Sequence, residues 1–281
     1  MRLALCTISF RHQLVSLGQL ATWAMPRGFK AIELWAPHAR SLNPEEDLDA
    51  NGFVSGVLPI SMVSDYLPLQ ADPRVFRNMA LVSSRLANRW AVKQLRTFAG
   101  NVASKAISAD QRRFYTKQLR EAAVIAADHG LKLLIETHPD TLADTLASTL
   151  QLLEDVDHDA LGVNFDFLHV WEGGDDPIEA HSVLQDKVHY YHLKNVRRFE
   201  DLCVFQSGNV YSPAGSRQGM VPLFEGVLDY HAYFSLILKH TNAYGSLEWF
   251  GDNGFNVIEV DAKEILSFSA RSVKRTAWTT S

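Results

Sequence analysis

Eight short apolar segments recur along this 281-residue chain, and longer segments of helical character separate them. The apolar segments are mostly continuous rather than alternating, which is typical of parallel strands that are buried on both faces. Eight strand–helix repeats close a parallel barrel, and the chain length fits the size of that fold. The predicted strands are Leu3–Ser9, Ala31–Trp35, Pro59–Ser64, Gln94–Phe98, Lys132–Glu136, Leu161–Asp166, Val188–Leu193 and Tyr244–Trp249.

The intervening segments carry the start and stop signals of helices. Pro26 and Gly28 end the first predicted helix, and Gly130 follows a long one where a left-handed residue is common. The predicted helices are Leu14–Met25, Pro44–Gly56, Asp72–Asn88, Ala109–His129, Thr141–Glu154, Pro177–Leu184, Asp229–His240 and Ala262–Lys274. We therefore predict an α/β fold, a single (β/α)8 TIM barrel domain over residues 1–281. A doubly wound open sheet is the alternative, but no dinucleotide-binding or P-loop motif follows a predicted strand.

One connection is unusually long. Residues 195–227, after the seventh strand, contain no clear helix and are rich in turn-forming residues. A loop of this length inside a compact domain is usually functional or disordered. Tyr211, Arg217 and Met220 favour an active-site loop that folds over a ligand, and a mobile surface insertion is the alternative.

Composition excludes several classes of function. The formal net charge is −5, the signs are interspersed, and no basic cluster suggests a nucleic-acid partner. No apolar segment approaches the roughly 20 residues that span a bilayer, so we expect no membrane partner. The two cysteines, Cys6 and Cys203, form no pair motif, which favours reduced thiols and a cytoplasmic location. The sequence is compatible with a homo-oligomer.

Polar residues gather at the ends of the last four predicted strands. Side chains two apart on a strand share a face, and the carboxyl ends of barrel strands meet at one mouth. The pairs are Glu136 with His138, Asn164 with Asp166 and His192 with Lys194, and Glu248 ends the last strand. Three carboxylates and one imidazole suit a divalent cation, Mn²⁺ or Mg²⁺ first, with Co²⁺ and Zn²⁺ as alternatives. The predicted metal ligands are Glu136, Asp166, His192 and Glu248.

Three neighbours of these ligands are candidate catalytic residues. His138 shares a face with Glu136, and His169 follows Asp166 by three positions. Each is a candidate general acid or base, because imidazole titrates near neutral pH. The alternatives are a hydrogen-bonding role behind a ligand for His138 and a rim position for His169. Lys194 is placed to stabilise a developing enolate or to anchor a substrate anion.

The first half of the chain supplies further candidates. Arg96 ends the fourth strand, and its guanidinium matches a carboxylate in a two-point contact. Glu33 lies near the end of the second strand, and Tyr66 follows the third. For Glu33 and Arg96, an ion pair with each other is the alternative to binding substrate.

Several sequence blocks resemble a known family. They are CTISFRHQL, IELWAPHA, SDYL, RTFAG, ETHPDTLADTL, DFLHVWE, HYYHLKN, NVYSPAGSRQGMVPLFEG and SLEWFG, in this order from Cys6 to Gly251. Together they resemble the 3-dehydroshikimate dehydratases of catechol siderophore biosynthesis, of the petrobactin type. That family lies within the xylose-isomerase-like TIM barrel superfamily of divalent-metal enzymes.

The resemblance implies a carbon–oxygen lyase that converts 3-dehydroshikimate to 3,4-dihydroxybenzoate (protocatechuate) with one divalent metal ion. It places the metal ligands on the four residues reached from the strand ends. It places the other site positions on Tyr66, Arg96, His138, His169 and Lys194. In such a site, Arg96 and Tyr66 would hold the substrate carboxylate, with Arg217 as a weaker candidate. Trp249 and Phe250 would line the ring pocket.

Three other functions remain as alternatives. A sugar or hydroxypyruvate isomerase or epimerase would use the same ligands on the same barrel without losing water. An endonuclease acting at abasic DNA sites would need more histidine ligands than the strand ends supply and a less acidic protein. A non-catalytic binding protein would not need both His138 and His169 near the metal.

Overall fold

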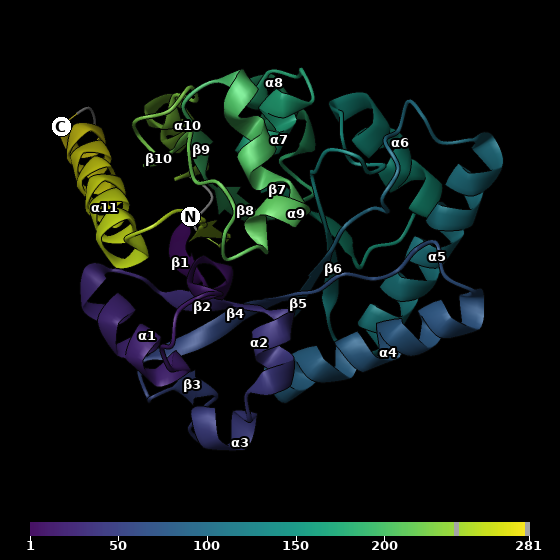
Figure 1. Ribbon diagram of the computed structural model, residues 1–281, viewed down its shortest axis with the longest axis horizontal. Coiled ribbons are helices and arrows are strands. Elements are labelled where there is room, and N and C mark those ends of the chain that lie inside the picture. Colours follow the sequence, from purple (N-terminus) through teal and green to yellow (C-terminus); the bar gives the residue numbers. More distant parts are fainter. Residues whose placement is uncertain (239–241, 279–281) are drawn as a thin grey trace.

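The computed structural model describes residues 1–238 and 242–278 (Figure 1). Eight parallel strands form the barrel, in the spatial order β2, β1, β11, β8, β7, β6, β5 and β4, and pairing of β2 with β4 closes it. The predicted (β/α)8 barrel is therefore confirmed. The barrel strands are β1 (Arg2–Cys6), β2 (Ala31–Trp35), β4 (Leu58–Ser64), β5 (Gln94–Thr97), β6 (Lys132–Glu136), β7 (Leu161–Asp166), β8 (Val188–Leu193) and β11 (Tyr244–Leu247).

Side chains fill the interior of the barrel beneath the carboxyl ends of the strands. Ala4, Ala31, Met62, Leu134 and Tyr190 form a buried cluster there, against which Tyr244 packs. The Tyr190 hydroxyl lies 2.8 Å from the hydroxyls of both Ser61 and Ser246, so this buried polar group is satisfied. Because alternate residues share a face, the polar residues two positions further along these strands lie on top of this floor.

Helices surround the strands and bury the outer faces of the sheet (Figure 1). Polar side chains mark several of their first turns. Ser16 and Gln19 form a reciprocal capping box at α1, and Asp72 and Ser108 cap α4 and α5. The helices around the barrel are α1 (Leu17–Ala24), α2 (Ala36–Ser41), α3 (Pro44–Asp47), α4 (Pro73–Arg89), α5 (Ala109–Asp128), α6 (Leu146–Val156), α7 (Phe167–Glu172), α8 (Pro177–Leu184), α10 (Tyr230–Ile237) and α11 (Gly254–Trp278).

Some predicted helix boundaries were wrong. The helix predicted over Pro44–Gly56 ends at Asp47, and β3 (Phe53–Val54) then pairs antiparallel with the start of β4. Gly52 and Gly56 flank this strand with positive φ, which a helix does not allow. Helix α11 begins eight residues before the predicted Ala262. The predicted end of the preceding helix, His240, lies outside the described residues.

The long connection after β8 forms short elements rather than an extended loop. It contains β9 (Asn195–Val196), the 3-10 helix η3 (Phe199–Phe205), α9 (Ser207–Val210) and β10 (Met220–Val221), and β9 pairs antiparallel with β10. At its base, the Asn195 amide donates to the carbonyls of Leu223 (2.7 Å) and Leu228 (3.0 Å). These bonds hold the two ends of the connection together.

Two further observations bear on the sequence expectations. Across residues 1–238 and 242–278, no helix combines the length and the apolar character needed to cross a membrane. Cys6 and Cys203 are free thiols, the first buried and the second exposed.

Candidate active site

A cavity of about 550 Å³ opens at the carboxyl ends of the barrel strands. Residues from the strand ends form its floor, and the long connection forms one wall. The residues that line it include Tyr66, Arg96, Phe98, Glu136, His138, His169, Glu172, Lys194, Phe205, Tyr211, Glu248 and Phe250. In a barrel of parallel strands, this is the end where active sites lie.

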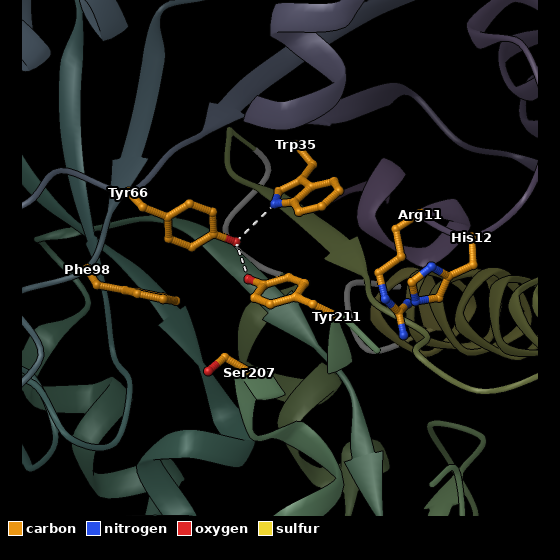
Figure 2. A pocket seen from close by; sticks show the side chains of 7 residues that line it. All are labelled: Arg11, His12, Trp35, Tyr66, Phe98, Ser207 and Tyr211. Atoms are coloured by element: carbon orange, nitrogen blue, oxygen red, sulfur yellow. Dashed lines mark hydrogen bonds between the residues drawn. The ribbon is translucent and has the colours of Figure 1, made fainter. Parts of the chain in front are cut away.

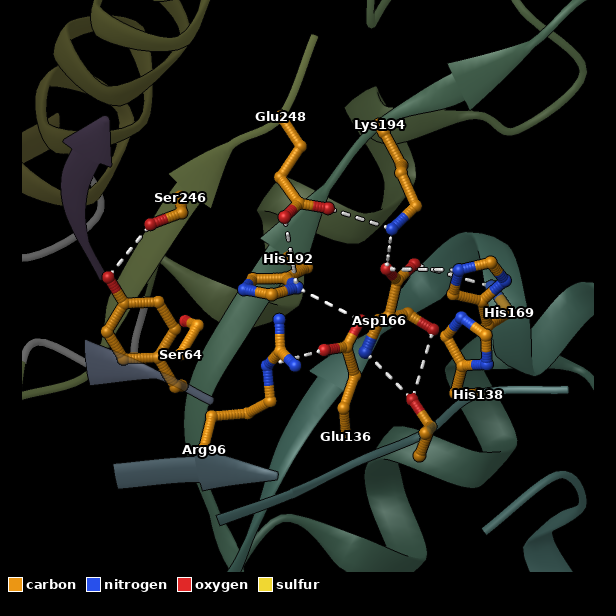
Figure 3. A network of polar contacts seen from close by, with 12 residues as sticks. Ser64, Arg96, Glu136, His138, Asp166, His169, His192, Lys194, Ser246 and Glu248 are labelled. Carbon is orange, nitrogen blue, oxygen red and sulfur yellow. Dashed lines mark hydrogen bonds and ion pairs between the residues drawn. The ribbon is translucent and has the colours of Figure 1, made fainter. Parts of the chain in front are cut away.

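His192 lies at the centre of the polar network on the cavity floor (Figure 3). Its imidazole is completely buried, and its Nδ1 atom lies 3.1 Å from Glu136 and 3.6 Å from Glu248. Atoms of Glu136, Asp166 and His192 that could bind a metal lie within 4.8 Å of one another. The structure therefore brings together the four residues that the strand ends predicted as ligands.

Glu33 contacts the other side of the same imidazole. It is completely buried, lies 3.0 Å from Nε2 of His192, and also accepts a hydrogen bond from Ser64. Burial opposes ionisation of Glu33, but His192 and the hydroxyls of Ser246 and Ser64 outweigh it and lower the pKa of Glu33 to about 2. Glu33 does not line the cavity, so it is placed to orient His192 rather than to contact substrate.

Lys194 bridges two of the predicted ligands. Its Nζ atom donates to Asp166 and, over 2.8 Å, to Glu248, and all three side chains are buried. Burial opposes the charge on Lys194, but Asp166 and Glu248 outweigh it and hold its pKa well above the ordinary value. The hydroxyl of Thr137 accepts a bond from the backbone N–H of Asp166 (2.9 Å), which fixes the start of α7.

Arg96 pairs with Glu136 rather than with Glu33. Its Nε atom lies 2.9 Å from Oε2 of Glu136, and both side chains are buried. The guanidinium also lies 5.0 Å from the ring centre of Tyr66 and 4.7 Å from that of Phe98. This stacking directs the guanidinium to the cavity wall, where it remains available to a bound anion.

The charges in this network fit a divalent cation. Four buried carboxylates (Glu33, Glu136, Asp166 and Glu248) face only two permanent cations (Arg96 and Lys194), which leaves two negative charges. Burial opposes a charge on His192, but Glu248, Glu33 and Glu136 outweigh it and hold the pKa of His192 well above its ordinary value. A cation at Nδ1 would supply the positive charge that this proton otherwise carries.

His138 has the environment of a neutral base. Its Nδ1 atom lies 2.8 Å from the carbonyl oxygen of Pro139, which can only accept, so Nδ1 carries the hydrogen and Nε2 keeps a lone pair. Burial, followed by the nearby His169, lowers the pKa of His138 to about 3. The lowered pKa keeps the imidazole uncharged at neutral pH, and the contact with Pro139 leaves Nε2 as the atom with a free lone pair.

His169 faces His138 across 4.4 Å between ring centres. Its Nδ1 atom lies 2.7 Å from Oε2 of Glu172, and its Nε2 atom lies 3.8 Å from Asp166. Contact with Glu172 fixes the orientation of the ring, and both histidines line the cavity. Two imidazoles in contact, one of them held neutral, can divide the roles of base and acid.

Two further substrate-binding candidates, Tyr66 and Arg217, differ in whether they line the cavity. Tyr66 lines the cavity, and its hydroxyl accepts a hydrogen bond from the Trp35 indole (3.0 Å) and lies 2.9 Å from the Tyr211 hydroxyl (Figure 2). Arg217 bonds to the carbonyls of Asn209 (3.3 Å) and Ser212 (2.9 Å) within its own loop and does not line the cavity.

The two aromatic residues after β11, Trp249 and Phe250, differ in their position relative to the cavity. Phe250 lines the cavity, whereas Trp249 lies outside its lining and donates its indole hydrogen to the carbonyl of Asp252 (2.7 Å). Both were predicted to surround the substrate ring, and only Phe250 is brought to the cavity.

Several residues of the site were missed from the sequence. Glu172 lies one helical turn after His169, a spacing that puts both side chains on one face. Ser246 lies two positions before Glu248 and therefore shares its face. Glu172 and Ser246 carried a local signal, whereas the wall residues Ile8 and Phe205 reach the cavity only through tertiary packing. Tyr211 was expected on the active-site loop, and it lines the cavity.

Comparison with known proteins agrees with this architecture. Residues 23–275 match the xylose isomerase-like TIM barrel family. The chain belongs to this family. It is 41% identical over 269 residues to the 3-dehydroshikimate dehydratase of Bacillus anthracis, covering 94% of this chain and 96% of that protein. The resemblance to the 3-dehydroshikimate dehydratases, a family of lyases, is thereby confirmed.

Solved structures give a consistent result. The crystal structure of the probable 3-dehydroshikimate dehydratase AsbF of Bacillus anthracis, described as involved in petrobactin synthesis, superposes with a TM-score of 0.88 at 40% identity. The match covers 94% of this chain and 98% of that chain. An L-ribulose 3-epimerase structure matches with a TM-score of 0.71 at 16% identity, over 100% of this chain and 98% of the other, which shows a shared fold.

Proposed function

We propose that this protein is a metal-dependent 3-dehydroshikimate dehydratase that forms 3,4-dihydroxybenzoate through an enolate. The observation that carries the proposal is the contact of His138 with His169 beside the cluster of Glu136, Asp166 and His192. Elimination of water needs one group to take a proton and another to release one. The 41% identity to a 3-dehydroshikimate dehydratase supports the choice of substrate.

Glu136, Asp166, His192 and Glu248 would hold the metal ion through their carboxylate oxygens and Nδ1 of His192. A bound divalent cation would act as a Lewis acid on the substrate ketone and its neighbouring hydroxyl. Mn²⁺ or Mg²⁺ suits three carboxylates and one imidazole best, with Co²⁺ and Zn²⁺ as alternatives. Glu33 would orient His192 by accepting the hydrogen of its Nε2 atom.

His138 takes the first proton in this mechanism. The proton leaves the ring carbon that carries the hydroxyl next to the ketone, and it goes to the free Nε2 atom of His138. Nδ1 keeps its hydrogen and donates it to the Pro139 carbonyl, which holds the ring in the required tautomer. The enolate oxygen that forms is stabilised by the Lys194 ammonium group, which lies between Asp166 and Glu248.

His169 releases the second proton. It protonates the hydroxyl on the carbon β to the ketone, so that water leaves and a carbon–carbon double bond forms. Its bond to Glu172 holds the ring in position for this transfer. Transfer of one more ring proton to the ketone oxygen gives the aromatic catechol, which makes the reaction strongly downhill.

Arg96 and Tyr66 orient the substrate. The guanidinium offers further N–H groups beyond its contact with Glu136, and the substrate carboxylate would accept them. Phe250 and Phe205 would exclude water from the ring, since both line the cavity. We propose that the protein acts in the cytoplasm and that its product supplies siderophore synthesis, by analogy with AsbF and its involvement in petrobactin synthesis.

Product analysis tests the proposal. The purified protein is incubated with 3-dehydroshikimate, and separately with ketoses and hydroxypyruvate, and the products are identified by mass spectrometry and ultraviolet absorbance. Loss of one water from 3-dehydroshikimate with formation of a catechol spectrum is the expected result. A product of unchanged mass from a ketose or from hydroxypyruvate, and none from 3-dehydroshikimate, would instead establish an isomerase or epimerase.

A further inference from the structure

Arg11 joins three segments that are far apart in the sequence. It directly follows the 3-10 helix η1 (Thr7–Phe10) at the end of β1. Its Nε atom donates to the carbonyl of Val210 (2.7 Å), Nη1 to that of Ile8 (3.2 Å), and Nη2 to that of Phe250 (3.2 Å). One guanidinium thus connects the barrel end at β1, the loop after β11 and the tip of the long connection.

All three acceptors belong to the wall of the catalytic cavity. Ile8, Val210 and Phe250 line it, and together with Cys6, Val204 and Met220 they form one buried apolar cluster. Arg11 itself does not line the catalytic cavity but lines an adjoining one, which shares Tyr66, Phe98, Ser207 and Tyr211 with it (Figure 2). The guanidinium bonds the backbone of the wall, and none of its three acceptors belongs to the reacting groups.

The supported wall flanks Lys194. The Lys194 ammonium group lies 5.8 Å from the ring centre of Phe250 and 5.9 Å from that of Phe205. Phe205 ends η3, five residues before Val210 in the same connection. Movement of the connection away from the barrel would thus admit water to Lys194 and to the cluster that it bridges.

Only arginine has the chemistry for these three bonds. A guanidinium presents planar N–H donors in several directions, whereas a lysine ammonium on a flexible stem acts as one compact charge. A lysine at position 11 keeps the positive charge and the apolar stem, but it cannot reach three carbonyls in different directions.

We propose that Arg11 is a positioning residue that fixes the long connection, residues 195–227, against the barrel and keeps the wall of the catalytic cavity closed. Its effect on turnover rests on the proposed function, whereas its effect on the wall does not. Replacing Arg11 with Lys removes two of the three charge-assisted bonds. This loss raises the equilibrium constant for local opening of the connection roughly 10- to 100-fold.

Hydrogen–deuterium exchange of the R11K variant tests the proposal. The peptides that cover residues 199–211 are compared with those that cover α5, which serves as an internal reference for global unfolding. We expect exchange roughly 10- to 100-fold faster in residues 199–211 only. The metal affinity remains unchanged, and kcat/KM for 3-dehydroshikimate falls.

The matched control is R27K. Arg27 also joins distant segments, since it bonds to the Trp23 carbonyl (2.9 Å) and to Glu259 (2.7 Å), but it lies away from the cavity. This variant should leave exchange in residues 199–211 unchanged. Equal exchange in R11K and wild type, or equal acceleration in α5, would overturn the proposal. If the wild type does not turn over 3-dehydroshikimate, the exchange result still decides the role of Arg11.

Discussion

The Nε2 atom of His192 lies 3.0 Å from Glu33, while its Nδ1 atom faces Glu136 and Glu248 on the opposite edge of the ring. One nitrogen is therefore committed to a buried carboxylate and the other to the predicted metal ligands. A second carboxylate behind a ligating histidine fixes its tautomer and raises its basicity.

Replacing Glu33 with Gln tests this relationship. The amide oxygen still accepts the Nε2 hydrogen, but the negative charge is lost, so we expect metal affinity to fall about 10- to 100-fold. Calorimetric titration of the metal-free protein with Mn²⁺ measures the effect. E45Q on the exposed face of α3 is the control. Unchanged metal affinity with a raised KM would show that Glu33 contacts substrate after all.

The role of His138 can be separated from metal binding. In the H138N variant, the side-chain amide can still donate to the Pro139 carbonyl, but no base is present. We expect kcat to fall by roughly 10²- to 10⁴-fold at nearly unchanged metal affinity. Steady-state kinetics and metal analysis on the same preparation measure both quantities. Loss of bound metal with normal turnover per remaining metal ion would place His138 behind a ligand instead.

The hydroxyl pair of Tyr66 and Tyr211 links substrate binding to the long connection. The Trp35 indole can only donate, and the bond between the two tyrosines uses one hydroxyl hydrogen. The second hydroxyl hydrogen is therefore free to be donated to a group outside the pair. The Y211F variant removes this bond, and we expect a KM for 3-dehydroshikimate about two- to tenfold higher, with metal affinity unchanged. An unaltered KM in both Y211F and Y66F would contradict a contact between this pair and the substrate.

Asp261 on α11 should make stability depend on pH. It is buried, and both of its carboxylate oxygens accept the Leu223 N–H (3.0 and 3.1 Å). Burial raises the pKa of Asp261 from 3.8 to about 7. Because the folded pKa is the higher one, the stability from this group is complete below about pH 4 and is lost as the pH rises through about 7.

The D261N variant keeps an acceptor for Leu223 but cannot ionise. Its stability relative to wild type should therefore increase by on the order of 2–3 kcal/mol between about pH 5 and pH 8. Urea unfolding of both proteins at the two pH values measures this change. A difference in unfolding free energy that does not vary with pH would show that Asp261 titrates normally in the folded protein.

The fold and the floor of the site were predictable because local periodicity determines both. Glu136, Asp166 and His192 end apolar strands, and a closed parallel barrel brings such ends to one mouth. The helix predicted over Pro44–Gly56 failed because Gly52 and Gly56 adopt positive φ. The presence of glycine at these two positions did not by itself show that the backbone needed a positive φ there.

The partners of the polar residues were harder to predict, because they depend on register and on tertiary packing. The sequence allowed Arg96 to pair with Glu33, but Arg96 forms an ion pair with Glu136, and Glu33 contacts His192. Arg217 carries the charge of a substrate clamp, yet it binds carbonyls of its own loop. Arg11 had no distinguishing local pattern, because its three acceptors lie in three segments.

Dependence of the reaction on a metal ion is the central claim, and one assay tests it most directly. The protein is stripped with a chelator, and Mn²⁺, Mg²⁺, Co²⁺ or Zn²⁺ is restored separately with 3-dehydroshikimate while the catechol absorbance is followed. We predict no product from the stripped protein and recovery of 3,4-dihydroxybenzoate formation with at least Mn²⁺ or Mg²⁺. Undiminished product formation by the fully stripped protein would contradict the account.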